Sequence, residues 1–357
     1  MLVLYITYID FANTPFGSSV RPQKMYDAFL AEGHDVKLLS GSQDNAHRSI
    51  RRQSVREVNR WLDSHCPDFC YIESPVYPIL LGADVRLIRR IHHIGIPIGY
   101  FYRDYHRKFP ESFPRRKSVK ELGIDLLQWR TDRVLRKADV VYFPSRAAAD
   151  LFSYKDSRLL PPAGENLLGT RHPEPHTCIY VGSISRNYGA ATLLEAFHIL
   201  NSAGEEYPLI LVTREKQWAN KTMLPHREAP WLEVRHVSGP ELEPLYERAN
   251  LAMAVYPANA YNDLSISVKI YEYTGHGLPI VVSGAAAMEE LVRRKGIGIT
   301  AETSPESVAE AVKTLLCNTE EYARVEKNIE AMVHEEGLWV HRVRQVAIEL
   351  TEKNKRN

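Results

Sequence analysis

The sequence has little cysteine and no long apolar run, and both absences limit what the protein can be. Cysteine occurs at only four of 357 positions, and the close pair Cys66 and Cys70 lacks companion Cys or His residues at zinc-ligand spacing. We expect reduced thiols in a cytoplasmic protein. No apolar run approaches the about 20 residues that cross a bilayer, and the N-terminus lacks the features of a signal peptide. Any membrane contact is therefore expected to be peripheral.

An excess of basic charge is also missing. Lys and Arg number 45 against 44 Asp and Glu, a formal net charge of +1, whereas nucleic-acid-binding proteins are usually more basic. We therefore expect no nucleic-acid partner. The charge is nevertheless uneven, because ten Lys or Arg lie within residues 86–120 and nine Glu lie within residues 302–336.

Short apolar runs alternate with amphipathic stretches along the chain, which predicts an α/β protein with mostly parallel sheets. The periodicity stops at the prolines of 161–164 and 172–175. We expect an N-terminal domain over 1–165, a C-terminal domain over 166–336, and a helix over 337–357 that returns to the N-terminal domain. Strands are predicted at 2–8, 36–40, 69–73, 96–102, 140–143, 178–181, 209–213, 232–237, 251–256 and 279–283.

The strongest local pattern is a helix that is followed by an apolar strand, over residues 267–282. If the helix begins near Ser267, the amides of Ser267 and Val268 and the positive end of the helix dipole can hold a phosphate. Lys269 adds a full charge, and Glu272 lies one turn later, where a carboxylate accepts hydrogen bonds from two ribose hydroxyls. This arrangement suits a nucleoside diphosphate. An ordinary surface pair between Lys269 and Glu272 is the alternative.

A second pattern is a predicted strand that ends in glycine near the start of the second domain. Gly182 lets a ligand approach the backbone closely, and Arg186 offers charged donors to a pyrophosphate. Arg214, which follows the next predicted strand, is a further candidate. A solvated surface position is the alternative for each arginine.

These two segments resemble the donor-binding region of retaining glycosyltransferases of the GT-B fold, in family four (glycosyl transferases group 1). The helix with Lys269, followed by Glu-Tyr, resembles bacterial polysaccharide-assembly enzymes of that family. The resemblance implies two Rossmann-like domains that face each other across a cleft. Glu272 matches the second of the family's two motif glutamates, which binds the ribose. Leu264 stands where the family usually has the first, and Asp263 is the neighbouring polar group that could supply its contact.

The resemblance also extends to the loops around the donor phosphates. The family's phosphate-binding arginine and lysine correspond here to Ser183 and Tyr188, and Arg186 is expected to compensate. In GT-B enzymes a glycine of the first loop of the N-terminal domain presents its amide to the donor, a role that the resemblance gives to Gly17. A plain turn is the alternative for Gly17.

Ionisable residues follow the predicted strand 96–102, at the end where open α/β sheets bind ligands. The segment resembles the family's polar loop that faces the reacting sugar. Asp104 is the first candidate for a catalytic or substrate-orienting group, and His106 is the second. A structural ion pair between Arg103 and Asp104 is the alternative.

Basic and aromatic residues are interleaved in the segment from Arg107 to Lys117. Such a segment can contact anionic lipid headgroups and so reach a lipid-linked acceptor. A solvated basic loop is the alternative.

The resemblance implies transfer of a sugar from a nucleoside diphosphate sugar, a UDP- or GDP-sugar, to a hydroxyl of a saccharide, glycolipid or other acceptor. It implies a hexosyltransferase of polysaccharide or glycoconjugate assembly that retains the anomeric configuration. No metal or other cofactor is expected, because the helix dipole, Arg186 and Lys269 cover the leaving diphosphate. The alternatives are a nucleotide-sugar epimerase of the same fold and a catalytically silent partner of a true transferase, which Leu264 keeps open.

Overall fold

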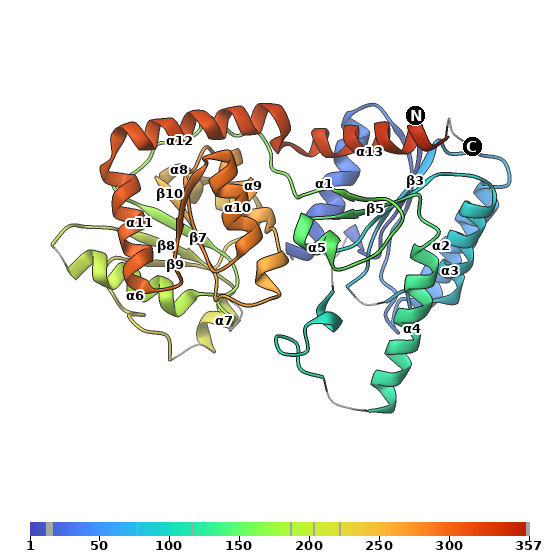
Figure 1. Ribbon diagram of the computed structural model, residues 1–357, viewed down its shortest axis with the longest axis horizontal. Coiled ribbons are helices and arrows are strands. Elements are labelled where there is room, and N and C mark those ends of the chain that lie inside the picture. Colours follow the sequence, from blue (N-terminus) through green and yellow to red (C-terminus); the bar gives the residue numbers. More distant parts are fainter. Residues whose placement is uncertain are drawn as a thin grey trace. The chain divides into compact units, whose positions relative to one another are not determined.

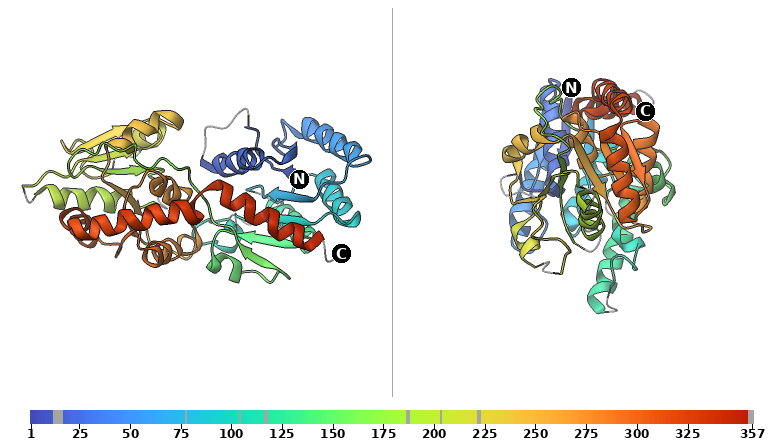
Figure 2. Two further views of the ribbon diagram at one scale, coloured as in Figure 1. Left: turned by 90° about the horizontal axis from the view of Figure 1, so that it is seen from above. Right: turned by 90° about the vertical axis from the view of Figure 1, so that its left-hand side faces the viewer.

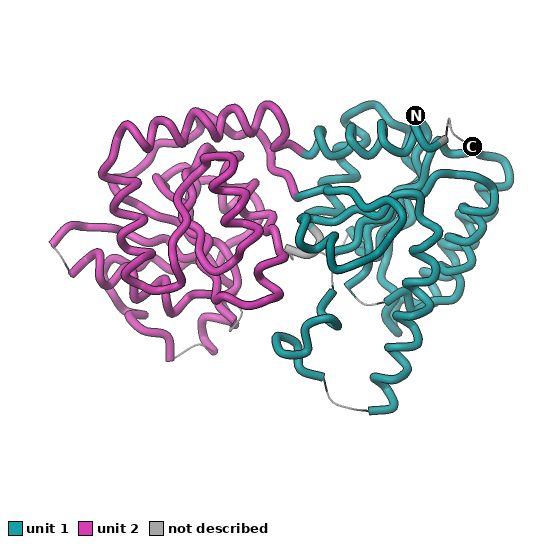
Figure 3. The backbone as a smooth tube through the Cα atoms, viewed as in Figure 1, with its two compact units in different colours: residues 1–161, 339–357 teal, residues 162–338 magenta. Residues whose placement is uncertain are grey.

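The computed structural model describes residues 1–11, 17–76, 78–103, 105–115, 118–185, 188–202, 204–220 and 223–354. Contacts within the chain divide it into two compact units (Figure 3). We call Met1–Pro161 together with Trp339–Asn357 the N-terminal unit, and Pro162–Leu338 the C-terminal unit. No helix among the described residues is long and apolar enough to cross a membrane.

The N-terminal unit is built on a parallel sheet of six strands in the order β2-β1-β3-β4-β5-β6. Its inner strands are almost continuously apolar because helices cover both faces of the sheet. From β1 the chain first adds β2 on one side and then β3 on the other, so the strand order reverses between β1 and β3. The strands are β1 (Leu2–Ile6), β2 (Asp35–Leu39), β3 (Phe69–Glu73), β4 (Ile98–Phe101), β5 (Val140–Phe143) and β6 (Ser157–Leu159).

The last helix of the chain belongs to the N-terminal unit. It packs beside α1 and over β3 and β4 (Figures 1 and 2). Leu350 of this helix lies so close to Gly99 that a Cβ at position 99 would come 2.8 Å from the Leu350 Cδ1. The helices of the unit are α1 (Gly17–Ala31), α2 (Arg48–Trp61), α3 (Gly82–His93), α4 (Val119–Leu135), α5 (Arg146–Asp150) and α13 (Trp339–Asn354), with a 3₁₀ turn at His106–Lys108.

Two buried ion pairs fix the helices of the N-terminal unit to the sheet. Arg51 of α2 donates from Nη2 to Asp84 Oδ1 at 2.7 Å and from Nη1 to the carbonyl of Thr7 at 2.7 Å. Arg21 of α1 donates from Nε to Glu73 Oε1 at 3.0 Å. Buried charges are stable only when they are paired. The Arg51–Asp84 pair joins α2 to α3, and the Arg21–Glu73 pair holds α1 against the end of β3.

The C-terminal unit contains a second parallel sheet of six strands, in the order β12-β11-β10-β7-β8-β9. From β7 the chain builds outward through β8 and β9, and it then returns to place β10 on the other side of β7. The point of reversal between β7 and β10 is where open α/β sheets bind ligands, beyond the carboxyl ends of the strands. The strands are β7 (Cys178–Val181), β8 (Leu209–Val212), β9 (Leu232–Arg235), β10 (Leu251–Val255), β11 (Ile280–Ser283) and β12 (Gly298–Ala301).

One apolar core lies on both faces of this second sheet and includes buried residues from every central strand. The two described sheets therefore have the α/β architecture that the alternating sequence pattern predicts. The helices of the C-terminal unit are α6 (Ala190–Ser202), α7 (Glu215–Ala219), α8 (Glu243–Arg248), α9 (Val268–Gly275), α10 (Ala286–Lys295), α11 (Pro305–Cys317) and α12 (Thr319–Met332), with 3₁₀ turns at Gly239–Leu242 and Asn262–Leu264 and a π-helical turn at Val333–Gly337.

Candidate donor site in the C-terminal unit

The start of α9 agrees with the start predicted from the sequence. Ser267 is the N-cap, with an extended backbone, and its side chain accepts a hydrogen bond from the amide of Lys269 at 3.3 Å. Val268 is the first helical residue. The first amides of a helix have no partner within the helix itself, and they carry the positive end of its dipole. An anion at this end would meet Ser267 and Val268 first.

Lys269 lies against the loop that follows β7. A Cβ added to Gly182 would overlap the Nζ of Lys269, so the glycine provides the space that the ammonium group occupies. The Nζ also lies 5.6 Å from the ring centroids of Tyr180 and of Tyr188. The two strongest sequence patterns thus meet at the point where the strand order reverses, although Gly182 and Lys269 are 87 positions apart in the sequence.

This environment differs from that of a lysine in a solvated surface pair. Desolvation by burial lowers the pKa of Lys269 from 10.5 to about 8, although the charge of Glu272 acts in the opposite direction. The charged form of such a lysine is strongly stabilised when an anion approaches, because the anion replaces the electrostatic stabilisation that the excluded water would have supplied.

The loop after β7 is fastened from two sides. The hydroxyl of Tyr180 donates to the carbonyl of Ser183 at 2.6 Å. Gln217 of α7 donates from Nε2 to Ser183 Oγ at 3.2 Å and accepts at Oε1 from the amide of Ile184 at 3.4 Å. The amide of Gly189 donates to the carbonyl of Val255 at 3.1 Å, which ties the far end of the loop to β10. Sequence reasoning missed Gln217, because nothing local marks a surface glutamine as a partner of this loop.

The two arginine candidates differ in what is described of them. Arg186 lies outside the described residues. Arg214 is exposed at the N-cap of α7, and its charge opposes the rise in the pKa of Tyr188 that burial causes. Arg214 is therefore near the aromatic ring that also lies close to Lys269. Tyr188 was predicted only as a replacement for the family lysine, and in the structure its ring lies beside the ammonium group of Lys269.

Glu272 is half-buried on α9, one turn after Lys269. Its charge raises the pKa of Lys269 and that of Tyr246. The carboxylate is thus close enough to both side chains to interact with them electrostatically. Its distance along the helix from Ser267 leaves room for the phosphate end of a ligand at the helix start.

Asp263 and Leu264 lie in a 3₁₀ turn that precedes α9. The Asp263 Oδ1 accepts a hydrogen bond from the amide of Ala286 at 3.2 Å, at the start of α10. The turn itself is held by Asn259, whose Oδ1 accepts from the amide of Asn262 at 2.9 Å. Asp263 therefore caps a neighbouring helix in addition to any role toward a ligand.

The described candidates of the N-terminal unit follow β1 and β4, two strands of its sheet. Gly17 is the first residue of α1, after the loop that leaves β1. His106 is half-buried in the 3₁₀ turn after β4, with its ring 4.1 Å from that of Phe113. Asp104 lies outside the described residues. The buried Glu73 at the end of β3 was not among the sequence candidates, although a carboxylate that closes an apolar strand is a recognisable signal.

The basic segment is partly neutralised by carboxylates of α4. Arg107 Nη1 lies 3.2 Å from Glu121 Oε2, and the other Nη of Arg107 also pairs with Asp125. Arg115 lies 3.4 Å from the same Asp125 carboxylate. Arg116 and Lys117 lie outside the described residues. The described part of the segment is therefore docked on α4 by ion pairs.

Part of the chain is similar in sequence to a known family. Residues 175–318, all within the C-terminal unit, match the family model Glyco_trans_1_4, described as glycosyl transferases group 1. No curated protein sequence matches the chain.

Solved structures show which fold the chain shares. A glycosyltransferase from Rickettsia africae superposes with a TM-score of 0.72 at 8% identity, over 100% of this chain and 99% of that one. WaaG, a glycosyltransferase involved in lipopolysaccharide biosynthesis, gives 0.63 at 14% identity, over 98% and 100%. Anabaena Alr3699/HepE in complex with UDP and glucose gives 0.64 at 15% identity, over 99% and 100%. At these identities the similarity is one of fold, the GT-B fold of glycosyltransferases.

Proposed function

We propose that this protein transfers a sugar from a UDP- or GDP-sugar to a hydroxyl acceptor. The proposal is supported by the match of residues 175–318 to the group 1 glycosyltransferase model and by the GT-B fold of the chain. The observation that carries the proposal is the position of Lys269, a partly desolvated cation beside Gly182 at the strand reversal. A nucleoside diphosphate is the ligand whose charge and length fit a cation, a helix start and a carboxylate in this order.

The diphosphate binds at the start of α9, on the amides of Ser267 and Val268 and on Lys269, with Arg186 and Arg214 as further cations. Glu272 accepts hydrogen bonds from the ribose hydroxyls. The fixed positive charge stabilises the diphosphate as it leaves, so the reaction requires no metal at this position.

The reacting sugar and the acceptor are assigned to residues outside this phosphate site. Asp104 and His106 of the N-terminal unit are the catalytic or orienting candidates, Gly17 offers its amide to the donor, and Asp263 supplies the polar contact that Leu264 lacks. Retention of the anomeric configuration is proposed from the resemblance to family four. The acceptor is a saccharide or glycolipid in polysaccharide or glycoconjugate assembly.

A glycolipid acceptor is favoured by the surface of α4, and it implies a cytoplasmic protein that binds the membrane peripherally. The N-terminal half of α4 projects from the rest of its unit (Figures 1 and 2). Its exposed apolar side chains recur at helical spacing, with exposed fractions of 86% for Val119, 70% for Leu122, 65% for Leu126 and 58% for Trp129. An apolar stripe beside the basic segment suits an anionic lipid surface.

Vesicle sedimentation tests the membrane part of the proposal by itself. The protein should sediment with vesicles of anionic phospholipid and not with neutral ones, and the double substitution Leu122→Ser and Leu126→Ser should abolish sedimentation. Ile348→Ser, at a position 62% exposed on α13, is the matched control and should leave it unchanged. Equal sedimentation of the double variant and the control would remove α4 from the membrane contact.

A panel of nucleotide sugars tests the activity. Release of nucleoside diphosphate, with or without an added acceptor, supports the transferase, and it should be lost in Lys269→Ala. Formation of an epimeric nucleotide sugar would identify an epimerase. Binding without turnover would identify the silent partner that the replacement at Leu264 suggests.

A further inference from the structure

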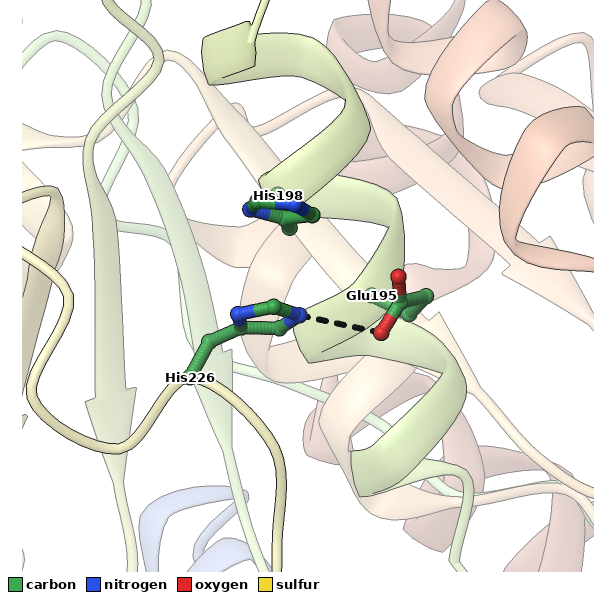
Figure 4. Close-up of side chains that lie close together, drawn as sticks. All are labelled: Glu195, His198 and His226. Atoms are coloured by element: carbon green, nitrogen blue, oxygen red, sulfur yellow. Dashed lines mark hydrogen bonds and ion pairs between the residues drawn. The ribbon is translucent and has the colours of Figure 1, made fainter.

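Three metal-ligating side chains gather on the surface of the C-terminal unit, on residues that the proposed donor site does not use. Glu195 and His198 are one turn apart on α6, and His226 reaches them from the segment after α7 (Figure 4). The His226 Nε2 lies 3.0 Å from the Glu195 Oε2. Ligand atoms of all three residues lie within 4.8 Å of one another.

The backbone of His226 has an unusual, positive φ angle. Its φ of 53° lies in the left-handed region, which residues with a side chain rarely adopt. The loop accepts this conformation at the residue whose imidazole is directed toward α6. The two imidazoles lie face to face, with centroids 4.0 Å apart and planes 13° from parallel.

We propose that Glu195, His198 and His226 bind a divalent transition-metal ion, with zinc the best fit. Two imidazoles and one carboxylate are a usual zinc ligand set, whereas calcium and magnesium prefer oxygen ligands alone. Ligand bonds of about 2.0–2.2 Å require the donor atoms to approach to about 3.3 Å. His198 is exposed, so its ring is free to turn out of the stack and complete the set with Glu195 and His226. Water would take the fourth position.

The segment around His226 is linked through α7 to the loop after β7, which belongs to the proposed donor site. Arg227, next to His226, donates from Nη1 to the carbonyl of Trp218 at 2.8 Å and covers the Trp218 ring at 4.1 Å. Trp218 follows Gln217, which holds Ser183 in the loop after β7. An ion that joins His226 to α6 therefore restrains the segment that supports the loop after β7. The site is structural or regulatory, because its ligands lie outside the proposed donor contacts.

Calorimetric titration of the metal-free protein with zinc tests the proposal. We expect one ion to bind per chain, and His198→Ala or His226→Ala to weaken binding by at least about tenfold, as loss of a ligand does. His334→Ala removes another exposed histidine of the same unit and should leave zinc binding unchanged. Affinity should also fall in acid, because protonated imidazole does not bind metal.

Two further measurements keep the result interpretable. Cobalt, which absorbs visible light when bound, reports the coordination of the wild type and of Glu195→Gln without any assay of activity. Circular dichroism shows whether each variant is folded. If His226→Ala unfolds the protein, His198→Ala still tests the proposal, because His198 is exposed. Zinc affinity that is the same in His198→Ala as in His334→Ala would overturn the site, and so would no binding to the wild type. Neither result would bear on Lys269 or Glu272.

Discussion

The ammonium group of Lys269 occupies the space that a side chain at position 182 would fill. The two residues come from different patterns of the sequence, one at the end of β7 and one at the start of α9, and each explains the other. The glycine is needed because the cation lies there, and the cation is partly desolvated because the loop covers it.

Gly182→Ala should lower the affinity for nucleoside diphosphate by at least about tenfold, or 1.4 kcal/mol, because the added methyl displaces the Lys269 ammonium. The protein should stay folded, since the displaced atom is the end of a flexible side chain. Gly123→Ala is the control, because nothing lies within 4 Å of a Cβ at that helical position. It should leave affinity unchanged and stabilise α4 by about 0.5–1 kcal/mol. Calorimetry and thermal melts measure both effects, and equal affinities would contradict the prediction.

Lys269→Met should reduce the affinity for nucleoside diphosphate by at least about tenfold and leave the affinity for the nucleoside unchanged. Below pH 8 the desolvated charge of Lys269 opposes folding, so the Met variant should melt at or above the wild-type temperature. Binding measurements with the two ligands, together with thermal melts at pH 7, decide this. Equal losses for nucleoside and diphosphate would mean that Lys269 does not contact phosphate.

The pH dependence of diphosphate binding should follow the titration of Lys269. Its pKa of about 8 in the free protein means that the lysine is charged below that pH and ready to bind an anion. Above pH 8 the Lys269 amine is mostly neutral and must take up a proton before it can pair with the anion, so the affinity should fall by up to about tenfold for each pH unit. The affinity of Lys269→Met should show no such step between pH 7 and pH 9. A wild-type affinity that is flat over this interval would leave Lys269 without a role in binding.

Glu272→Ala should weaken the binding of nucleoside and of nucleoside diphosphate by the same roughly 1.5–3 kcal/mol, the range for hydrogen bonds to a charged group. The effect should differ in this way from that of Lys269, because the proposed partner of Glu272 is the ribose. The 2′-deoxy form of the nucleoside diphosphate should bind the variant and the wild type more equally. Calorimetry with both ligands checks the prediction, and an unchanged dissociation constant would exclude Glu272 from the site.

His276 should make the C-terminal unit sensitive to acid. Desolvation lowers its pKa from 6.5 to about 4, and the half-exposed carboxylate of Glu243, 3.4 Å away, does not offset this effect. The unfolded chain takes up the proton near pH 6.5 and the folded one does not, so the free energy of unfolding should fall between pH 6.5 and pH 4. The loss should be on the order of 2 kcal/mol. Urea titrations at both pH values should show a smaller loss in His276→Gln, and equal losses would contradict this assignment.

The sequence alone was sufficient for the central strands and for the start of α9. Residues 69–73, 140–143 and 178–181 were predicted with the bounds that β3, β5 and β7 have, because strands covered on both faces are nearly continuous apolar runs. The strands β6 and β12 were missed. Both lie at sheet edges and are only partly buried or exposed, so their sequences carry no apolar pattern.

The contact between Lys269 and Gly182 could not be predicted, because local sequence patterns do not determine the order of the strands in a sheet. The same holds for Gln217, which supports the loop after β7 from α7, and for His226, which approaches α6 from a later segment. The family resemblance supplied the proposed role of Glu272, because spacing alone left both a ribose contact and an ordinary helical ion pair open. The arginine and aspartate predictions at Arg186 and Asp104 fall on positions outside the described residues.

The position of α13 has a consequence for the synthesis of the protein. The sheet face around Gly99 is covered by Leu350, from a helix that leaves the ribosome only after the whole C-terminal unit has been made. Residues 162–338 are continuous and can fold as soon as they emerge, whereas the N-terminal unit must wait with part of its apolar surface bare. The N-terminal unit is thus translated first and completed last. Until α13 has been made, the uncovered apolar face of its sheet is the surface that a molecular chaperone would bind.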